Sequence, residues 1–348
     1  MFPLAVACGN AFVLKPSERV PGAAMALADL ALRAGVPPGV LNVVHGAHDV
    51  VNTLCDAPQV AAVSFVGGDA AGRHIHARAA AAGKRCQINM GAKNHAIVLP
   101  DAPPAATAAA LAGAAFGAAG QRCMALSVAV FVGDCEETLR ELERAARALR
   151  VGDGAHPDTD VGPLISVAAA ERARRLVASA LAQGAVARVD GRHLGAGALA
   201  PHLDAAAFVG PTLLTDVTRD MEAYEQEIFA PVLLCMRANS LDDALALVNA
   251  SRYGNGASIF TRDGGAARRF AREVQAGQVG VNVPIPVAVP LFSFTGWRAS
   301  FAGDLHFYGR EGVDFFTRAK TVTQRWRASS GEGGVRAATT MPTSASSG

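Results

Sequence analysis

Short apolar runs rich in β-branched residues alternate with Ala-rich helical stretches, and this alternation constrains the fold more than any other feature. In the first part of the chain the expected strands are 12–15, 41–46, 61–68 and 84–90, and the expected helices are 21–35, 48–56 and 69–82. Because nearly continuous apolar strands alternate with helices, the pattern predicts an α/β fold with a parallel sheet covered by helices.

A second region repeats this alternation after residue 93. The expected strands are 94–100, 127–133, 227–238 and 257–263, and the expected helices are 102–118, 136–152, 241–251 and 266–277. Residues 152–215 are rich in Gly and Pro and carry no predicted element. Residues 320–326, KTVTQRW, alternate and predict a late strand, and the polar tail 328–348 is expected to be disordered.

Composition and charge exclude several classes of protein. Hydrophobic residues make up 51% of the 348 residues and charged residues 18%, which is typical of a globular chain long enough for two domains. The net charge is +2 and the arginines are scattered, so the sequence predicts no nucleic-acid partner. No uninterrupted apolar run reaches membrane-spanning length, so no membrane partner is expected either.

The cysteines and histidines show no metal-binding or disulfide spacing. The six cysteines are far apart and form no CxxC pair, and the nine histidines give no ligand pattern. We therefore expect free thiols, no metal site and a cytoplasmic location. The first residues also lack the basic leader of a signal peptide and resemble the later part of a buried helix.

Two short segments carry residues suited to a nucleotide. FVGGDAAGR (65–73) places Gly67 and Gly72 at a strand-to-helix junction, where a glycine lets the backbone approach a pyrophosphate. VLKPSE (13–18) places Lys15 and Glu18 just after a strand, where they could bind ribose hydroxyls or a phosphate. Read alone, FVGGDAAGR is as compatible with an ordinary strand-to-helix turn as with a nucleotide site. Lys15 and Glu18, read alone, are more typical of ordinary charges at the start of a helix.

One cysteine lies where a nucleophile could be presented. Cys123, in GQRCMA (120–125), follows an Ala- and Gly-rich helical run and precedes an apolar strand. A lone cysteine in an apolar chain can equally be an inert buried side chain.

Several long segments, taken in order, carry a resemblance to a known family. They are MFPLAVACGNAFVLKPSE, SFVGGDAAGR, NMGAKNHAIVLPDA, GAAFGAAGQRCMA, GPTLLTDV, EIFAPVL, FSFTGWRASFAGDLHFYG and KTVTQRW. With these segments the chain resembles the aldehyde dehydrogenase superfamily, and within it the CoA-acylating methylmalonate-semialdehyde dehydrogenase family, from Met1 to about Trp326.

The resemblance implies an aldehyde dehydrogenase-like α/β fold with a Rossmann-like nucleotide domain and an α/β catalytic domain. It implies a partial NAD-binding domain at 1–90, the catalytic domain at 91–290, and a C-terminal return with an oligomerisation strand at 291–327. Relatives carry a further N-terminal part that holds the first strand of the nucleotide sheet, most of the bridging arm, an oxyanion-hole asparagine and a second substrate arginine. We expect these features to be missing here, with an exposed sheet edge and apolar face.

Residue by residue, the resemblance implies a cysteine nucleophile. Cys123 matches the thiolate that attacks the aldehyde carbonyl; the thiohemiacetal so formed gives hydride to NAD, which leaves the acyl group on Cys123 as a thioester. Nearby amides and the cation of Arg122 are expected to favour the thiolate. Arg122 also matches a guanidinium that binds the substrate's carboxylate. The alternative role is an ion pair with another side chain, without contact to the substrate.

Asn89 is the position that separates two reaction outcomes. Hydrolytic relatives carry a glutamate base there, 34 residues before the nucleophile (123 − 89 = 34). An amide cannot take a proton from water in the needed range, so the thioester should wait for the thiol of coenzyme A. The expected products are propionyl-CoA or acetyl-CoA with loss of CO2, from methylmalonate or malonate semialdehyde.

The resemblance places the remaining site residues around NAD. Glu227 matches a carboxylate that accepts from the nicotinamide ribose, and Phe229 a ring beside the nicotinamide. Gly67 and Gly68 match the pyrophosphate turn, and Glu18 should repel the 2′-phosphate of NADP.

Two alternatives stay open beside the acylating enzyme. One is an inactive remnant that retains only nucleotide binding or pairing with a full-length subunit. The other is a hydrolytic NAD-dependent aldehyde dehydrogenase. The family implies a small-molecule substrate and a homo-oligomer.

Overall fold

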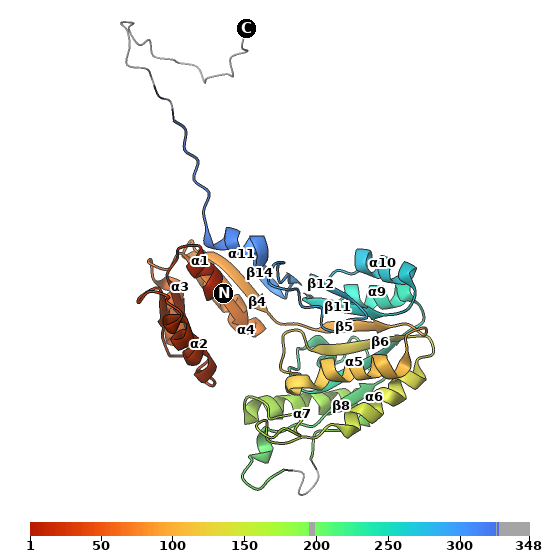
Figure 1. Ribbon diagram of the computed structural model, residues 1–348. Helices are drawn as coiled ribbons and strands as arrows, with labels where there is room; N and C mark the ends of the chain where they lie inside the picture. Colours follow the sequence, from red (N-terminus) through yellow and green to blue (C-terminus); the bar gives the residue numbers. More distant parts are fainter. Residues whose placement is uncertain (195–198, 325, 327–348) are drawn as a thin grey trace, which may run out of the picture. The chain divides into compact units, whose positions relative to one another are not determined.

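The computed structural model describes residues 1–194, 199–324 and 326 (Figure 1). The chain divides into two compact units, Met1–Thr317 and Arg318–Gly348. Every helix and strand found in the described residues lies in the first unit. The tail expected to be disordered, 328–348, lies outside the described residues.

The first ninety residues form two small sheets with four helices. In chain order the elements are α1 (Phe2–Ala7), β1 (Phe12–Leu14), α2 (Gly22–Arg33), β2 (Leu41–Val43), α3 (His48–Asp56), β3 (Ala62–Gly67), α4 (Asp69–Ala81) and β4 (Arg85–Met90). β1 pairs with β2 in parallel, and β3 pairs with β4 in parallel. A late strand, β14 (Phe301–Gly303), joins the second sheet antiparallel to β4.

A seven-stranded sheet forms the larger part of the first unit. Its spatial order is β12 (Gln278–Val281), β11 (Gly256–Phe260), β5 (Asn94–Val98), β6 (Leu126–Val132), β9 (Val232–Ala238), β8 (Thr212–Thr215) and β7 (Val186–Val189). All neighbouring strands run parallel except the edge pair β7 and β8, which is antiparallel. The predicted α/β sheet is therefore present, with a mixed edge.

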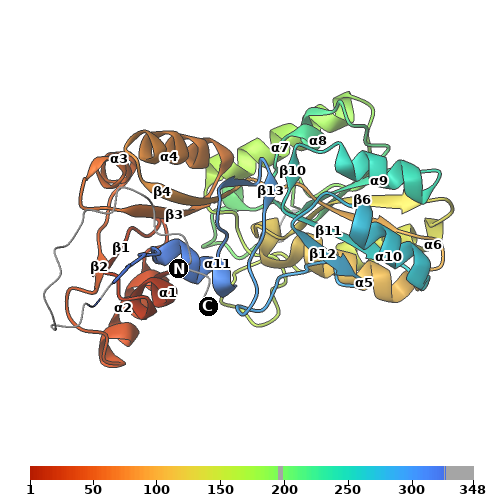
Figure 2. The ribbon, with the colours of Figure 1, turned by 90° about the horizontal axis from the view of Figure 1, so that it is seen from above.

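Helices cover both faces of this sheet. Figure 2 shows α5 (Pro104–Phe116) on one side of the sheet and α7 (Val167–Ala182) and α9 (Leu241–Asn249) on the other; α6 (Glu136–Ala148) packs beside α5, and α10 (Gly264–Glu273) packs against β12 and α9. The smaller elements are η1 (Gly117–Gly120), η2 (Ala205–Ala207), α8 (Glu222–Glu225), β10 (Tyr253–Gly254), β13 (Trp297–Arg298) and α11 (Gly309–Phe316). The antiparallel pairing of β13 with β10 appears beside the large sheet in Figure 2.

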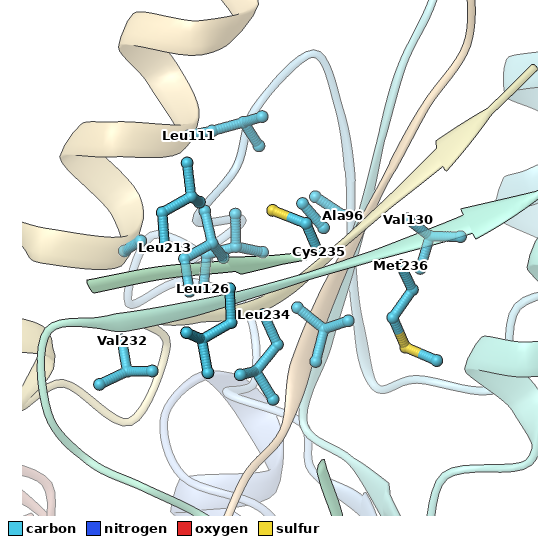
Figure 3. Close-up of a cluster of buried hydrophobic side chains, with 14 of the residues drawn as sticks. Ala96, Leu111, Leu126, Val130, Leu213, Val232, Leu234, Cys235 and Met236 are labelled. Carbon is cyan, nitrogen blue, oxygen red and sulfur yellow. The ribbon is translucent and has the colours of Figure 1, made fainter. Parts of the chain in front are cut away.

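The core lies on the central strands of the large sheet. Val128, Val130, Leu233 and Leu234, from β6 and β9, have no exposed surface, and Leu111 of α5 belongs to the same buried cluster; Figure 3 labels Leu111, Val130 and Leu234 within it. Each such side chain contributes about 1.5–3 kcal/mol by leaving water. Because both faces are covered, these strands are apolar throughout rather than alternating.

Each element predicted from 12 to 90 is present, with ends shifted by a few residues, and so are those predicted from 94 to 148 and from 227 to 277. The sequence analysis missed α7, β7 and β8 in the Gly- and Pro-rich middle. α7 carries a capping signal that could have located it, because the hydroxyl of Ser166 accepts from the Ala169 N–H at 3.2 Å.

The late strand predicted at 320–326 does not form within the single chain and stays a prediction. Residues 320–324 and 326 have no strand assignment, and Arg325 lies outside the described residues. A strand needs a hydrogen-bonded neighbour, and the sequence analysis expected its partner in another subunit.

Several apolar side chains of α2 are exposed. This helix has no buried residue, and Met25, Leu27, Leu30 and Leu32 are between 44% and 56% exposed. None of the helices in the described residues is long and apolar enough to cross a membrane.

The core assignment predicts unequal costs for one substitution at two sites in the same sheet. Val130→Ala removes two methyl groups from a fully buried position on β6 and should lower the free energy of unfolding by about 2 kcal/mol. Val186→Ala, on the edge strand β7 where the side chain is 50% exposed, is the matched control and should cost about 0.5 kcal/mol or less. Urea titrations of the two variants measure this, and equal midpoints would contradict the assignment.

Candidate active site

Cys123 lies in the loop between η1 and β6, and the loop reaches it through a left-handed turn. Ala118, Ala119 and Gly120 have φ angles of 52°, 53° and 68°. Gly120 could not be another residue, because a Cβ there would lie 2.2 Å from the carbonyl oxygen of Ala230. Two alanines in this conformation cost on the order of 1 kcal/mol each, and such strain concentrates at functional sites.

The side chain of Cys123 is exposed at a shallow hollow that opens to solvent. The walls come from the loop itself and from the chain that precedes β5 and β9. The lining residues are Ala92, Asn94, Gly120, Arg122, Cys123, Ala125, Leu126, Ser127, Glu227, Ile228, Phe229, Ala230 and Val232. The structure thus brings four of the predicted site residues together: Arg122, Cys123, Glu227 and Phe229.

The surroundings of Cys123 raise the pKa of its thiol. Partial burial raises its pKa above the ordinary thiol value, the backbone N–H groups of Met124 and Cys123 oppose that rise, and the Glu227 carboxylate adds to it. The predicted help from the amides is therefore present. The predicted help from Arg122 stays a prediction, because its guanidinium is not among the groups that shift this pKa.

The guanidinium of Arg122 is exposed and lies over Gly117 instead. A Cβ built on Gly117 would lie 2.5–2.9 Å from three guanidinium atoms. The side chain therefore occupies the space that the missing Cβ leaves open, at the edge of the hollow.

Glu227 is a partly buried carboxyl group of the site. Its Oε1 accepts from the Ala92 N–H at 2.9 Å, and burial raises the pKa of the carboxyl, while Lys93 and Arg172 oppose the rise. The preceding segment is held by Lys93, whose Nζ donates to the carbonyls of Ala223 and Gln226 at 2.6 Å each. Burial lowers the pKa of Lys93 to about 7.

Phe229 completes the same loop. It has a φ of 55° and is 43% exposed, so its ring stands at the rim of the hollow. A bulky residue in this backbone region is unusual and indicates that the surrounding loop fixes it.

Asn89 lies on β4, outside the lining of the Cys123 hollow. Its backbone pairs with Val66 and Phe301, and its side-chain Oδ1 is buried with no hydrogen-bond partner among the described residues. Such an orphaned acceptor in a native site indicates a group that is satisfied by a ligand or water.

The glycines of the β3-to-α4 turn have different roles. Gly68 is the N-cap of α4, no side chain caps that end, and the space beside its Cα is open. At Gly67 a Cβ would meet the Phe65 ring at 2.4 Å, and at Gly72 it would meet Met90 at 2.7 Å. Gly72 therefore serves the packing of α4 on β4, whereas Gly68 leaves the helix N-terminus free for an anion.

Lys15 and Glu18 lie just after β1 and contact each other. Lys15 Nζ lies 3.4 Å from a Glu18 carboxylate oxygen and donates to the Gly46 carbonyl at 2.9 Å. Glu18 is exposed, and its pKa is lowered by its own backbone N–H and by Lys15. No group of three or more potential metal ligands occurs in the described residues.

Sequence reasoning missed three residues of the site: Lys93, Asn94 and Asn255. Both asparagines donate to the carbonyl oxygen of Cys123, at 3.0 and 2.9 Å. The signal that was available is a polar side chain at the first position of a fully buried strand, since Asn94 begins β5. Most buried side-chain amides in proteins are hydrogen-bonded, as these two are.

Comparisons with known proteins agree with one another. A sequence model described as "Aldehyde dehydrogenase family" matches residues 1–322. The mitochondrial methylmalonate-semialdehyde dehydrogenase [acylating] of Arabidopsis thaliana is 57% identical over 327 residues, which are 94% of this chain and 53% of that protein. The Bos taurus methylmalonate-semialdehyde/malonate-semialdehyde dehydrogenase [acylating], also named mitochondrial, is 49% identical over 94% of this chain and 60% of that protein.

Solved structures give the same fold. A crystal structure from Sinorhizobium meliloti 1021, complexed with NAD, matches with a TM-score of 0.91 and 46% identity, and covers 94% of this chain and 66% of that one. The chain spans between about half and two thirds of the length of the curated relatives named above.

The electrostatics of the hollow predict a thiol that reacts slowly with alkylating agents near neutral pH. Because only the thiolate reacts and burial raises the pKa of Cys123, its alkylation by iodoacetamide should reach half its maximal rate above about pH 8.5, the ordinary thiol value. Mass spectrometry of the Cys123 peptide over a pH series measures this rate. A plateau already reached at pH 7 would contradict the electrostatic description.

Proposed function

The chain belongs to the aldehyde dehydrogenase family, and we propose that it is the catalytic part of an NAD-dependent, CoA-acylating dehydrogenase for methylmalonate or malonate semialdehyde. One observation carries the proposal: the Cys123 thiol is exposed in a hollow, while the position 34 residues before it holds an amide instead of a carboxylate base. The whole-protein activity is proposed, because the chain spans only part of the length of its relatives.

Cys123 acts as the nucleophile in this proposal. Its thiolate attacks the carbonyl carbon of the aldehyde to form a thiohemiacetal, and loss of hydride leaves an acyl group on the sulfur as a thioester. The N–H groups of Met124 and Cys123 favour the thiolate that the attack requires. NAD, when bound, supplies the hydride acceptor.

Asn89 decides how the acyl group leaves. Its amide cannot act as a general base for water, so the thioester persists until the thiol of coenzyme A attacks the acyl carbon. The new thioester forms on the CoA sulfur, and the Cys123 thiolate is released. Loss of the substrate carboxylate as CO2 then gives propionyl-CoA from methylmalonate semialdehyde, or acetyl-CoA from malonate semialdehyde.

Arg122 is proposed to select the acid-bearing substrate. Its exposed guanidinium lines the hollow beside the nucleophile, and a planar fork of donors matches the geometry of a carboxylate. The carboxyl group of a semialdehyde could thus bind at the rim while its aldehyde carbon meets the sulfur.

The residues present fit NAD. The uncapped N-terminus of α4 at Gly68 is open to a pyrophosphate, and the orphaned Oδ1 of Asn89 is free to accept from a ligand. Glu227 and Phe229, at the hollow, suit the nicotinamide ribose and ring. Lys15 and Glu18 suit the adenosine ribose, and the carboxylate of Glu18 disfavours a 2′-phosphate.

The domain limits belong to the same proposal. We assign 1–90 to nucleotide binding, 91–290 to catalysis and 291–327 to a return segment with an oligomerisation strand. The pairing of β14 with β4 supports the return segment, since it brings residues 301–303 back to the sheet of the nucleotide region. A homo-oligomer and a reducing compartment are proposed as well; the two curated relatives above are named mitochondrial, in contrast to the cytoplasmic expectation.

The direct test of the proposal is NADH formation at 340 nm by the purified chain with malonate semialdehyde and NAD, with and without CoA. Turnover that requires CoA and yields acetyl-CoA is the expected result, and Cys123→Ala should abolish it, because no thioester can form. A free acid as product would favour the hydrolytic alternative. A folded chain that forms no NADH would favour the inactive remnant.

Arg122→Leu tests the carboxylate contact. KM for malonate semialdehyde should rise roughly tenfold to a hundredfold, the usual cost of a lost charge-assisted hydrogen bond, whereas KM for propanal should stay unchanged. Arg144→Leu, which removes an equally exposed arginine from α6, is the control. Equal losses on both substrates would remove Arg122 from substrate selection.

A further inference from the structure

The carbonyl group of Cys123 receives unusually complete hydrogen bonding from two side chains. Asn94 Nδ2 donates to it at 3.0 Å and Asn255 Nδ2 donates to it at 2.9 Å. A carbonyl oxygen has two lone pairs, so both of its acceptor sites are used. Both asparagines are at most 5% exposed, and hydrogen bonds in such a dry environment are costly to break.

Asn94 is itself fixed to the neighbouring strand. Its Oδ1 accepts from the Gly256 N–H at 3.0 Å, and the second hydrogen of its amide goes to the Ala125 carbonyl at 2.9 Å. Asn94 therefore ties the amino end of β5 to the amino end of β11 and to the loop on both sides of Met124.

Asn255 is fixed through the residue that follows the cysteine. Its Nδ2 also donates to the Met124 sulfur at 3.0 Å, and Gln278 Nε2 lies 3.4 Å from the same sulfur. Met124 is 2% exposed and fills the space above Gly256, where a Cβ would lie 2.5 Å from the Met124 methyl group.

Because the peptide bond is planar, the hydrogen bonds to the Cys123 carbonyl also fix the direction of the Met124 N–H. The described peptide bonds are all trans, so the Cys123 carbonyl and the Met124 N–H point in opposite directions. The carbonyl points inward to the two asparagines, so the N–H points outward. That N–H is one of the two backbone groups that favour the Cys123 thiolate.

We infer that Asn94 and Asn255 form an asparagine pair that positions the nucleophile: by occupying both lone pairs of the Cys123 carbonyl, they aim the Met124 N–H at the thiol. The two residues are positioning residues, since they contact the backbone and not the sulfur. The inference rests on the proposed role of Cys123 as nucleophile.

The reactivity of the Cys123 thiol tests this inference without substrate, NAD or CoA. In Asn255→Asp the donor is replaced by an oxygen that repels the carbonyl, at nearly unchanged volume. The rate of Cys123 alkylation by iodoacetamide at fixed pH should fall about tenfold, and its pH profile should move upward by about one unit. Asn255→Ala, which removes one donor without adding charge, should shift the profile in the same direction by less, and it serves if the aspartate variant does not fold.

Two controls separate positioning from general destabilisation. Asn249→Asp also removes an amide that donates to a carbonyl, that of Glu273 at 2.9 Å, but it lies at the end of α9, and it should leave Cys123 unaffected. Cys8, near the N-terminus, is partly exposed, and its alkylation rate in the same digest is an internal reference. The inference is overturned if folded Asn255 variants alkylate Cys123 at the wild-type rate, or if Asn249→Asp slows it equally.

The outcome is independent of the proposed reaction. A wild-type chain that forms no NADH would contradict the proposed function, yet the alkylation profiles would still show whether the asparagine pair sets the state of the thiol. Conversely, an active enzyme with an unchanged thiol in both Asn255 variants would contradict the asparagine pair alone.

Discussion

The burial of β5, β6 and β9 between two layers of helices is the constraint on which the rest of the structure depends. These strands are apolar along their length, so their backbone groups must be satisfied by the ladder, and polar side chains are confined to the strand ends. At the amino ends of β11, β5, β6 and β9, four neighbours in the sheet, lie Asn255, Asn94, Cys123 and the 227–231 loop. The dry sheet thus gathers residues from distant parts of the sequence at one edge.

The electrostatics of that edge follow from the same burial. Desolvation raises the pKa of Cys123 and Glu227 and lowers that of Lys93, so each group is shifted toward its neutral form. Hydrogen bonds act in the other direction, from the Ala92 N–H on Glu227 and from the backbone amides on Cys123, and so does the mutual attraction of Lys93 and Glu227. A nucleophile in such a setting depends on the orientation of individual peptide groups more than on nearby formal charges. This explains why Arg122, although adjacent in sequence, makes no resolved contribution to the thiol.

Much of the fold could be predicted from the sequence because apolar periodicity reflects burial directly. The strands from 12 to 132 and from 232 to 260 were located this way. The helix α7 was missed, since its short apolar stripe lies among Gly- and Pro-rich segments. The antiparallel strands β7 and β14 were not predicted either. The strand predicted at 320–326 is absent from the part of it that the structure describes, because alternation cannot say whether a pairing partner is at hand.

By itself the sequence determined the α/β class, the family, the cysteine at GQRCMA and the amide at position 89, because these are properties of local pattern and residue identity. The tertiary structure alone decided which residues surround Cys123 and how its thiol is biased. Glu227 is 104 residues from Cys123 (227 − 123 = 104) and Asn255 is 132 residues away, and only the parallel register of the sheet brings them together. The direction of a peptide N–H and the loss of water around a thiol arise from packing, which no local pattern encodes.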